Sequence, residues 1–218
     1  MERVIQTTAD GSTTIYLPEI DEHYHSVKGA LTESEHIYIN SALAVHPDTK
    51  LRVLEIGFGT GLNAFLSAIY PKKDIEYFTL ELYPLSTELI EKTGYANLFS
   101  EEAKNTFYAL HHAEWNKEVT INPHFHITKI LDDFTNPGIE LPKDIDVVYF
   151  DAFAPEKQPQ MWSQECLQRI YDIMAPHSIF ITYCAKGEIR RRLQSLGFTT
   201  QRIPGPPNGK REILRAIK

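Results

Sequence analysis

The chain has 218 residues and an ordinary globular composition, with 42% hydrophobic and 23% charged residues. This length predicts one main domain with a sizeable core, and the composition excludes a disordered chain. No apolar run approaches the roughly 20 residues of a membrane helix, and the first residues do not resemble a signal peptide. Two cysteines, Cys166 and Cys184, make neither a disulfide framework nor a zinc site. We therefore expect a cytoplasmic, reduced protein with no metal and no membrane partner.

The charge is distributed unevenly along the chain. The net charge of −7 by itself argues against a nucleic-acid partner. However, residues 183–218 hold nine Lys or Arg against two Asp or Glu, whereas the preceding 182 residues hold thirteen against twenty-seven. A basic end on an acidic body can bind a polyanion locally, and a solvated basic helix and tail is an equally good interpretation.

Residues 1–49 predict a small N-terminal extension of a hairpin and a helix. Two β-prone runs flank Asp10 and Gly11, which is a strong short hairpin signal. In the following helical pattern, Thr32 and Glu35 have the spacing of a capping box. We expect this extension to form a lid or platform ahead of the main domain.

Residues 50–218 predict strands that alternate with helices. Residues 96–123 carry no strand signal and predict a helical insertion. The alternation predicts an α/β fold with a mostly parallel sheet of seven strands. The last two predicted strands have no helix between them, so they should form a hairpin with an antiparallel last strand.

The run LRVLEIGFGTGLN, residues 51–63, predicts a buried strand, a tight turn and the start of a helix. Gly57, Gly59 and Gly61 suit a backbone that turns sharply and lets a ligand approach. No Lys or Arg follows these glycines, which argues against a phosphate-binding loop. An ordinary glycine-rich connection is the alternative interpretation.

Acidic residues stand at the expected ends of four strands. Glu55, Glu81, Asp133 and Asp151 would meet at the carboxyl edge of the sheet, where ligands of such folds bind. Glu81 follows Gly61 by 20 residues, which suits a carboxylate that accepts bonds from both ribose hydroxyls. So acidic a crevice repels phosphates, and a cationic, ribose-bearing cofactor such as S-adenosylmethionine fits better than a dinucleotide.

The string DAFAPEKQPQMW, residues 151–162, follows the fourth predicted strand. A carboxylate before a turn rich in proline and aromatic residues suits an acceptor pocket. Asp151 would hold an amine nucleophile, and Phe153 would pack against the flat ring of the acceptor. The alternative for Asp151 is a cap on the following turn.

These strings carry a family resemblance. EIGFGTGLN, the acid after the second strand and DAFAPEKQPQMW resemble the methyltransferase part of the MnmC/MnmD family, bacterial tRNA-modifying enzymes that complete 5-methylaminomethyl-(2-thio)uridine. DEHYHSVKGALTESEHIYI and GKREILRAIK also match the family's pattern, so the resemblance covers essentially the whole chain. It implies a Rossmann-like class I methyltransferase fold and S-adenosylmethionine as cofactor. The implied reaction converts the 5-aminomethyl group of the tRNA wobble uridine to 5-methylaminomethyl.

The resemblance also implies an organisation and roles for residues. The chain has no room for the family's FAD-dependent oxidase domain, so we expect a stand-alone methyltransferase with a functional link to the enzymes that install the aminomethyl group. The implied catalytic residues are Asp151 and Phe153. The implied cofactor-binding residues are Tyr24, Glu33, Glu55, Gly57, Gly59, Thr60, Gly61, Asn63, Glu81, Asp132, Asp133 and Asp151. The family usually has Gly-Asp where this chain has Asp132-Asp133, which leaves open the residue that meets the adenine.

The basic end supplies candidates for tRNA binding through phosphate contacts. They are Lys186, Arg190, Arg191, Arg192, Lys210 and Arg211. Three consecutive arginines cannot all point one way from a helix, so we expect at least one of them to be structural.

Two other functions remain open from the sequence. A polyamine aminopropyltransferase also uses a sulfonium donor and an amine nucleophile, although its fourth strand usually ends in a string with a second acid that DAFAP lacks. A non-catalytic Rossmann-like module that binds tRNA or protein is the other alternative.

Overall fold

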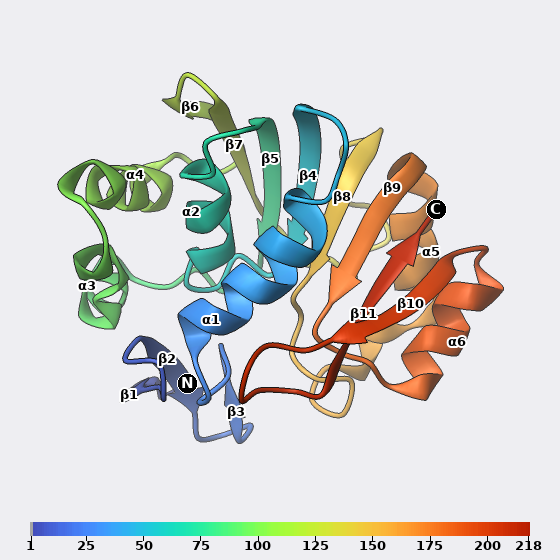
Figure 1. Ribbon diagram of the computed structural model, residues 1–218, viewed down its shortest axis with the longest axis horizontal. Helices are drawn as coiled ribbons and strands as arrows, with labels where there is room; N and C mark the ends of the chain where they lie inside the picture. The colour runs from blue at the N-terminus through green and yellow to red at the C-terminus, as the bar shows by residue number, and fades with distance from the viewer. Residues whose placement is uncertain (1) are drawn as a thin grey trace.

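The computed structural model describes residues 2–218 and shows a central sheet with helices on both faces (Figure 1). The sheet has eight strands in the spatial order β10-β11-β9-β8-β4-β5-β7-β6. In chain order they are β4 (Lys50–Ile56), β5 (Asp74–Glu81), β6 (Glu118–Asn122), β7 (Phe125–Leu131), β8 (Ile145–Phe150), β9 (Met174–Thr182), β10 (Thr199–Pro204) and β11 (Glu212–Ile217). The five central strands pair in parallel, whereas β6 and β11 run antiparallel to their neighbours.

Two apolar cores lie on the two faces of this sheet, because successive side chains of a strand point to opposite faces. Along β4, Leu51 and Val53 join one core, and Leu54 and Ile56 join the other. The first core includes residues of α1 (Ala30–Ser34), η1 (Glu35–Leu43), α2 (Leu62–Ala68), α3 (Thr87–Thr93), η2 (Tyr95–Leu98) and α4 (Glu101–His112). The second includes residues of η3 (Pro159–Trp162), α5 (Gln164–Ile173) and α6 (Gly187–Ser195). Within residues 2–218, no helix is both long and apolar enough to cross a membrane.

Serine side chains begin three of these helices. Ser86, Ser100 and Ser163 each accept a hydrogen bond from the backbone N–H three residues later, which satisfies a donor that the helix leaves free. Gly94 ends α3 in the left-handed conformation, with φ of 68°. These local signals explain why the predicted helices and strands alternate as the sequence indicates.

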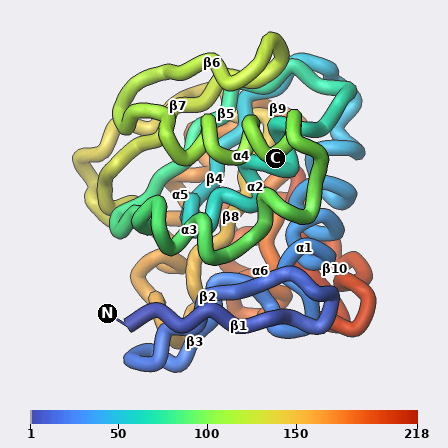
Figure 2. Tube along the Cα trace, turned by 90° about the vertical axis from the view of Figure 1, so that its left-hand side faces the viewer, coloured from blue at the N-terminus to red at the C-terminus, as the bar shows by residue number. Residues whose placement is uncertain are grey.

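The N-terminal residues form a separate three-stranded sheet of β1 (Val4–Thr7), β2 (Thr13–Leu17) and β3 (Glu22–His23). The predicted hairpin around Asp10 and Gly11 is confirmed, because β1 and β2 pair antiparallel on either side of it. Figure 2 shows this sheet at one end of the molecule, below α3. Thr13 fastens it there: its hydroxyl donates to the carbonyl of Thr93 at 2.6 Å, and its own carbonyl accepts from the Tyr95 hydroxyl at 2.5 Å.

The helix of residues 30–43 packs into the first core of the main sheet. Ile37 and Leu43 are fully buried there, in the same cluster as Ile181 of β9 and Ile213 of β11. Its second part, η1, is a π-helix, and the bond from the N–H of Ala44 to the carbonyl of Ile39 at 2.8 Å has the i to i+5 spacing of such a helix. The helix of residues 30–43, near the start of the chain, therefore shares a core with β9 and β11, near its end.

The sheet has one strand more than the seven predicted, because part of the predicted helical insertion of residues 96–123 is a strand. Residues 101–112 are helical as expected, but β6 pairs antiparallel with β7. The β-branched run Val119, Thr120 and Ile121 favours a strand. With only five residues, this strand is too short to show a clear alternating pattern.

The predicted capping box of Thr32 and Glu35 is wrong. The helix already begins at Ala30, and Thr32 lies inside its first turn. The N–H and the hydroxyl of Thr32 both donate to Asp10 Oδ2 at 2.9 Å. The cap is thus a carboxylate from the hairpin, about twenty residues earlier, and local spacing cannot reveal it.

We expect Asp10→Ala to lower the free energy of unfolding by about 1 kcal/mol, the usual effect of losing a helix cap. Burial raises the pKa of Asp10, but the bonds from Ser12, Thr32 and Thr8 outweigh burial and hold that pKa below its usual value. The stabilisation should therefore be present above about pH 4 and disappear as the pH falls further. Urea unfolding at pH 7 and pH 3 measures both effects. Glu140→Ala, at an exposed carboxylate, is the control, and an equal loss in both variants would contradict the capping role.

Candidate active site

A cavity of about 750 Å³ opens at the carboxyl edge of the parallel strands. Its walls include the segments that follow β4, β5, β7 and β8, namely residues 56–60, 80–83, 132–135 and 151–153. The strand order changes direction between β4 and β8, because the chain proceeds from β4 through β5 to β7 and then returns to the other side of β4. Ligands of open α/β sheets bind at this switch point.

Glycines let the turn after β4 pass close to its neighbours. Gly57 has φ of 95°, and a Cβ there would lie 2.9 Å from the carbonyl oxygen of Asp151. Gly59 has φ of 49°, and its Cβ would lie 3.1 Å from Cδ1 of Tyr24. A side chain at either position would be strained and would push apart two walls of the cavity.

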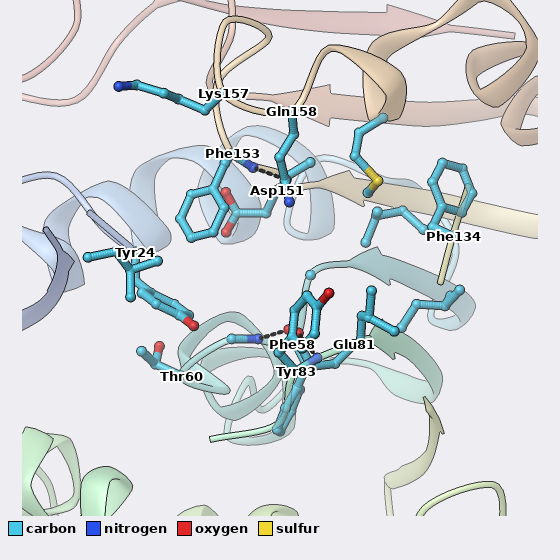
Figure 3. Close-up of a pocket in the computed structure, with 18 of the residues that line it drawn as sticks. Tyr24, Phe58, Thr60, Glu81, Tyr83, Phe134, Asp151, Phe153, Lys157 and Gln158 are labelled. Carbon is cyan, nitrogen blue, oxygen red and sulfur yellow. Dashed lines mark hydrogen bonds between the residues drawn. The ribbon is translucent and has the colours of Figure 1, made fainter. Parts of the chain in front are cut away.

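Glu81 ends β5 and faces the cavity opposite Asp151 and Phe153 (Figure 3). Its Oε2 accepts the N–H of Gly59 at 2.9 Å, and its Oε1 accepts the N–H of Tyr83 at 2.8 Å. Two backbone donors therefore fix the carboxylate, and each oxygen keeps a lone pair for a ligand hydroxyl. This is the arrangement expected for a residue that holds a ribose.

Asp132 and Asp133, in the loop after β7, both line the cavity. Asp133 Oδ1 accepts from the N–H and the hydroxyl of Thr135, both at 2.8 Å. Asp132 Oδ1 accepts the N–H of Asp133 at 2.7 Å. Each aspartate thus uses one carboxylate oxygen for a bond within the loop and keeps the other for a ligand. Which of the two meets the adenine stays a prediction.

Asp151 directly follows β8, on the other side of the glycine turn. Its Oδ1 accepts the hydroxyl of Tyr38 at 2.6 Å, and its Oδ2 accepts the side-chain amide of Asn63 at 2.9 Å. Burial raises the pKa of Asp151 to about 6, although the bonds from Tyr38 and Asn63 and the charge of Lys210 act in the opposite direction. Asp151 is therefore an oriented carboxylate that is mostly ionised at neutral pH.

The rest of the DAFAPEKQPQMW string holds this wall in place. The N–H of Phe153 donates to Gln158 Oε1 at 3.1 Å, and its carbonyl accepts the indole N–H of Trp162 at 2.8 Å. The ring of Phe153 meets that of Tyr24 edge to face, with centroids 5.4 Å apart. Gln158 and Trp162 thus serve the shape of the turn, whereas Phe153 presents its ring to the cavity.

The front segment contributes to the same cavity. Tyr24 and His25 line it, and His25 Nε2 lies 2.6 Å from the hydroxyl of Thr60 in the glycine turn. Glu33, in α1, accepts the N–H of Ser26 at 2.8 Å, and burial raises its pKa to about 7. Glu33 does not line the cavity.

Two other predicted cofactor residues lie behind the cavity wall. Gly61 begins α2 and is buried against the ring of His111. Glu55 is 0% exposed, and its Oε2 accepts the hydroxyl of Thr79 at 2.7 Å. Burial raises the pKa of Glu55 to about 8. Neither Gly61 nor Glu55 lines the cavity, so their roles in cofactor binding stay predictions.

The predicted tRNA-binding residues lie on α6 and in the loop between β10 and β11, but they are not equally accessible. Arg192 donates to the carbonyl of Trp162 at 2.6 Å and pairs with Glu188, so it is the structural arginine that the sequence leads us to expect. Lys186 pairs with Glu156. Lys210 lies 3.7 Å above the centre of the Tyr183 ring, close to Asp151.

Arg191, Arg211, Lys186 and Lys210 are exposed and Arg190 is half-buried, but Lys186 is paired with Glu156 and Lys210 lies over the ring of Tyr183. A surface for a polyanion would therefore depend on Arg191 and Arg211 more than on the other four residues.

Sequence reasoning missed Tyr38 and Tyr183. Tyr38 lies in an apolar helix, and its partner Asp151 is 113 residues further along the chain, so it looks like any core tyrosine. Tyr183 lines the cavity and donates its hydroxyl to the carbonyl of Ala152 at 2.9 Å. The one hint was three consecutive large residues, Ile37 to Ile39, which do not fit the one-sided pattern of an α-helix.

Within residues 2–218, the structure holds no group of three or more His, Cys, Asp or Glu side chains placed to bind a metal ion. The cavity instead combines a fixed carboxylate at Glu81, an oriented carboxylate at Asp151 and aromatic rings between them. Such walls suit an organic ligand with hydroxyl and cationic groups.

Comparison with known proteins supports this interpretation. A family model described as S-adenosyl-L-methionine-dependent methyltransferase matches residues 101–218. The tRNA 5-methylaminomethyl-2-thiouridine biosynthesis bifunctional protein MnmC of Leptospira borgpetersenii serovar Hardjo-bovis (strain JB197) is 29% identical over 208 residues, covering 89% of this chain and 32% of that protein. The protein of the same name from Pseudomonas fluorescens (strain Pf0-1) is 28% identical over 212 residues, with the same coverage of 89% and 32%. The chain thus spans about a third of the length of these relatives.

Two solved structures share the fold. MnmC2 from Aquifex aeolicus superposes with a TM-score of 0.76 at 23% identity, over 99% of this chain and 70% of that chain. Spermidine synthase from Thermotoga maritima superposes with a TM-score of 0.64 at 18% identity, over 99% of this chain and 69% of that chain. The expected Rossmann-like methyltransferase fold is thereby confirmed.

We expect Glu55→Gln to change how stability depends on pH. In the folded protein Glu55 keeps its proton up to about pH 8, whereas the unfolded chain releases it near pH 4. The stability of the native protein therefore falls as the pH rises between these values, and the uncharged glutamine removes that fall. Between pH 5 and pH 8 the free energy of unfolding of the variant, relative to that of the wild type, should rise by about 2–4 kcal/mol, as measured by urea unfolding. Parallel curves for the two proteins would refute the buried, protonated state.

Proposed function

The chain belongs to the family of S-adenosyl-L-methionine-dependent methyltransferases, and from this premise we propose that it methylates the 5-aminomethyl group of a wobble uridine in tRNA. The product is 5-methylaminomethyluridine, with or without the 2-thio group. The observation that carries the proposal is the partly buried, doubly hydrogen-bonded carboxylate of Asp151 beside the ring of Phe153, on the cavity wall opposite Glu81. Relatives named for 5-methylaminomethyl-2-thiouridine biosynthesis contain a region similar to 89% of this chain.

The residues present fit S-adenosylmethionine. Glu81 would accept bonds from the ribose hydroxyls, since both of its oxygens keep a lone pair after binding two backbone N–H groups. Asp132 or Asp133 would meet the adenine, and the turn of Gly57 and Gly59 would let the methionine portion approach the backbone. The acidic walls attract a cationic cofactor and repel phosphates. When bound, S-adenosylmethionine supplies an electrophilic methyl group on a positively charged sulfur.

Asp151 would bind and orient the acceptor amine. A primary amine is nucleophilic only when neutral, and it must point its lone pair at the carbon it attacks. Tyr38 and Asn63 hold the carboxylate in one orientation, from which it accepts an N–H of the amine. Because this carboxylate is ionised above about pH 6, it is also able to take up the proton that the amine loses. Phe153 would stack on the uracil ring.

Positioning supplies most of the rate in this scheme. The sulfur leaves as a neutral thioether, so the protein needs no strong acid at that end. Holding the amine and the methyl donor in line replaces a collision in solution, which is worth several kcal/mol of the barrier. Tyr24 and Phe153, whose rings meet edge to face, both line the cavity and add apolar surface to its wall.

For tRNA, we place the phosphate contacts on Arg191 and Arg211. Both are exposed. Arg211 follows Lys210, which lies by Asp151, and Arg191 is on α6 beside Arg192, which donates to the carbonyl of Trp162. The wobble base would be turned out of the anticodon loop into the cavity, because single-stranded bases are read by stacking and edge contacts. The functional link to enzymes that install the aminomethyl group follows from the substrate itself.

The aminopropyltransferase alternative is not favoured. Its support is the fold shared with a spermidine synthase at 18% identity, whereas the matched family model describes methyltransferases. An acceptor wall with one carboxylate and an exposed pair of arginines also suits a polyanion-borne monoamine better than a free polyamine. Intact contacts at Glu81 and Asp151 argue against a module without catalysis.

The first test is mass analysis of nucleosides after incubation of aminomethyl-bearing tRNA with methyl-labelled S-adenosylmethionine. The wild type should place one label on the aminomethyl group. Asp151→Asn should slow transfer by about 100-fold or more, since it removes the oriented charge that holds the amine, and should leave cofactor affinity within a few-fold. Asp172→Asn, at an exposed carboxylate on α5, is the matched control. No label with the wild type would refute the function, and full activity of Asp151→Asn would refute the role of Asp151.

The second test reverses the charges of Arg191 and Arg211 together. The double Glu variant should bind tRNA at least about 10-fold more weakly in a filter-binding assay, and its affinity should fall less steeply with salt because two phosphate contacts are lost. The control reverses Lys50 and Lys72, two exposed lysines near the amino ends of β4 and β5. Equal losses in both double variants would show a general charge effect in place of a binding surface.

A further inference from the structure

Tyr38 occupies an unusual place for a polar group. Its side chain is 2% exposed, packed on the ring of Tyr149 with centroids 5.1 Å apart, yet its hydroxyl lies 2.6 Å from Asp151 Oδ1. Burial, and then the charge of Asp151, raises the pKa of Tyr38 well above its usual value, so the hydroxyl keeps its proton at any physiological pH. It is therefore a permanent donor to that carboxylate.

We propose that Tyr38 is a positioning residue that, together with Asn63, holds Asp151 in the one orientation from which it receives the acceptor amine. The inference rests on the proposed function for the identity of the acceptor, but the geometry of the carboxylate stands independently of it. Asp151 follows the last residue of a strand, where its side chain is otherwise free to rotate. Tyr38 and Asn63 each take one oxygen, from two different helices, and so fix both torsions of the carboxylate.

The π-helix explains how Tyr38 reaches this place. In η1 the wider turn buries three consecutive residues, Ile37, Tyr38 and Ile39, against the sheet. An α-helix turns by about 100° per residue and would direct one of three neighbours away from the core. π-helical turns are rare and recur at functional sites, where they aim a side chain that regular geometry cannot. Here the aimed side chain is the donor to Asp151.

Other charged groups around Asp151 do not replace this contact. Lys210, from the loop between β10 and β11, lowers the pKa of Asp151, and it lies over the ring of Tyr183. The remaining titratable groups that feel the charge of Asp151 are Glu33 of α1, Glu55 of β4, Tyr77 of β5 and Tyr183 after β9. The charge of Asp151 raises the pKa of all four, so it favours their protonated forms, and none of them supplies a positive charge. Tyr38 and Asn63 are the neutral donors that favour the ionised form of Asp151.

Tyr38→Phe removes only the donor, and Tyr149→Phe is its matched control. Tyr149 is as deeply buried, and its ring packs on that of Tyr38, but its hydroxyl pairs with that of Ser67 at 3.2 Å. With ¹³C-labelled aspartate, NMR titration of the protein without tRNA follows the Asp151 carboxyl, assigned by its loss in Asp151→Asn. The midpoint, near pH 6 in the wild type, should rise by about one unit or more in Tyr38→Phe and stay in place in Tyr149→Phe.

Kinetics give the second readout. In Tyr38→Phe the acid limb of the pH profile of kcat should move to higher pH, as the NMR midpoint does, because activity needs ionised Asp151. The dissociation constant of S-adenosylmethionine should stay unchanged. Tyr38→Met removes the same hydroxyl in another shape and should show the same shift, which covers a failure of the first variant to fold. An unshifted midpoint in both Tyr38 variants, or an equal shift in Tyr149→Phe, would overturn the proposal. A wild type that methylates no tRNA would refute the function alone, because the titration uses neither tRNA nor turnover.

Discussion

The contact of the Gly57 backbone with the carbonyl of Asp151 is the constraint on which the site depends. It joins the carboxyl ends of β4 and β8, the two strands at which the sheet changes direction. Because no Cβ fits in that space, the turn proposed to receive the cofactor lies directly against the residue proposed to receive the acceptor. On one side of this contact the cavity wall is acidic and suits a cation, and on the other side it is lined by aromatic rings. Methyl transfer needs donor and acceptor in contact, and the fold supplies that contact through its backbone.

Three carboxylates near this contact, Glu55, Glu81 and Asp151, differ in their environment. Glu81 is held by two backbone N–H groups at the cavity surface, Asp151 by two side chains at its inner wall, and Glu55 lies behind both without access to the ligand. Burial raises the pKa of Glu55 to about 8 and that of Asp151 to about 6. The charge of Asp151 raises the pKa of Glu55 further, whereas the charge of Lys210 lowers that of Asp151. The environments of these three acids therefore suit the roles proposed for them: a neutral support at Glu55, an amine-binding carboxylate at Asp151 and a ribose ligand at Glu81.

Much of this arrangement is predictable from the sequence. Strong local signals, such as the glycine turn, the acids at strand ends and Asp10-Gly11, predicted the parallel sheet, the cavity edge and the hairpin. The features that the sequence did not predict depend on contacts between residues far apart in the chain. The strand of residues 118–122 is stabilised by pairing with β7, and the cap of α1 comes from Asp10 across a hairpin. Tyr38 meets its partner 113 residues away, and no spacing rule connects them. The sequence likewise did not predict which basic residues are paired. The acids that pair with Lys186 and Arg192, Glu156 and Glu188, are identified only from the folded position of α6.

The helix of residues 30–43 has a consequence for synthesis on the ribosome. It leaves the ribosome early, yet the surfaces that cover Ile37 and Leu43 include Ile181 and Ile213, which are among the last residues made. Until then its apolar face has no complete partner, and contacts between the two ends of a chain are the slowest to form. The nascent protein therefore carries an apolar helix whose cover is incomplete until its last strands are made, and such surfaces attract chaperones and other chains. Asp151 gains its hydrogen bond from Tyr38 only when that helix docks.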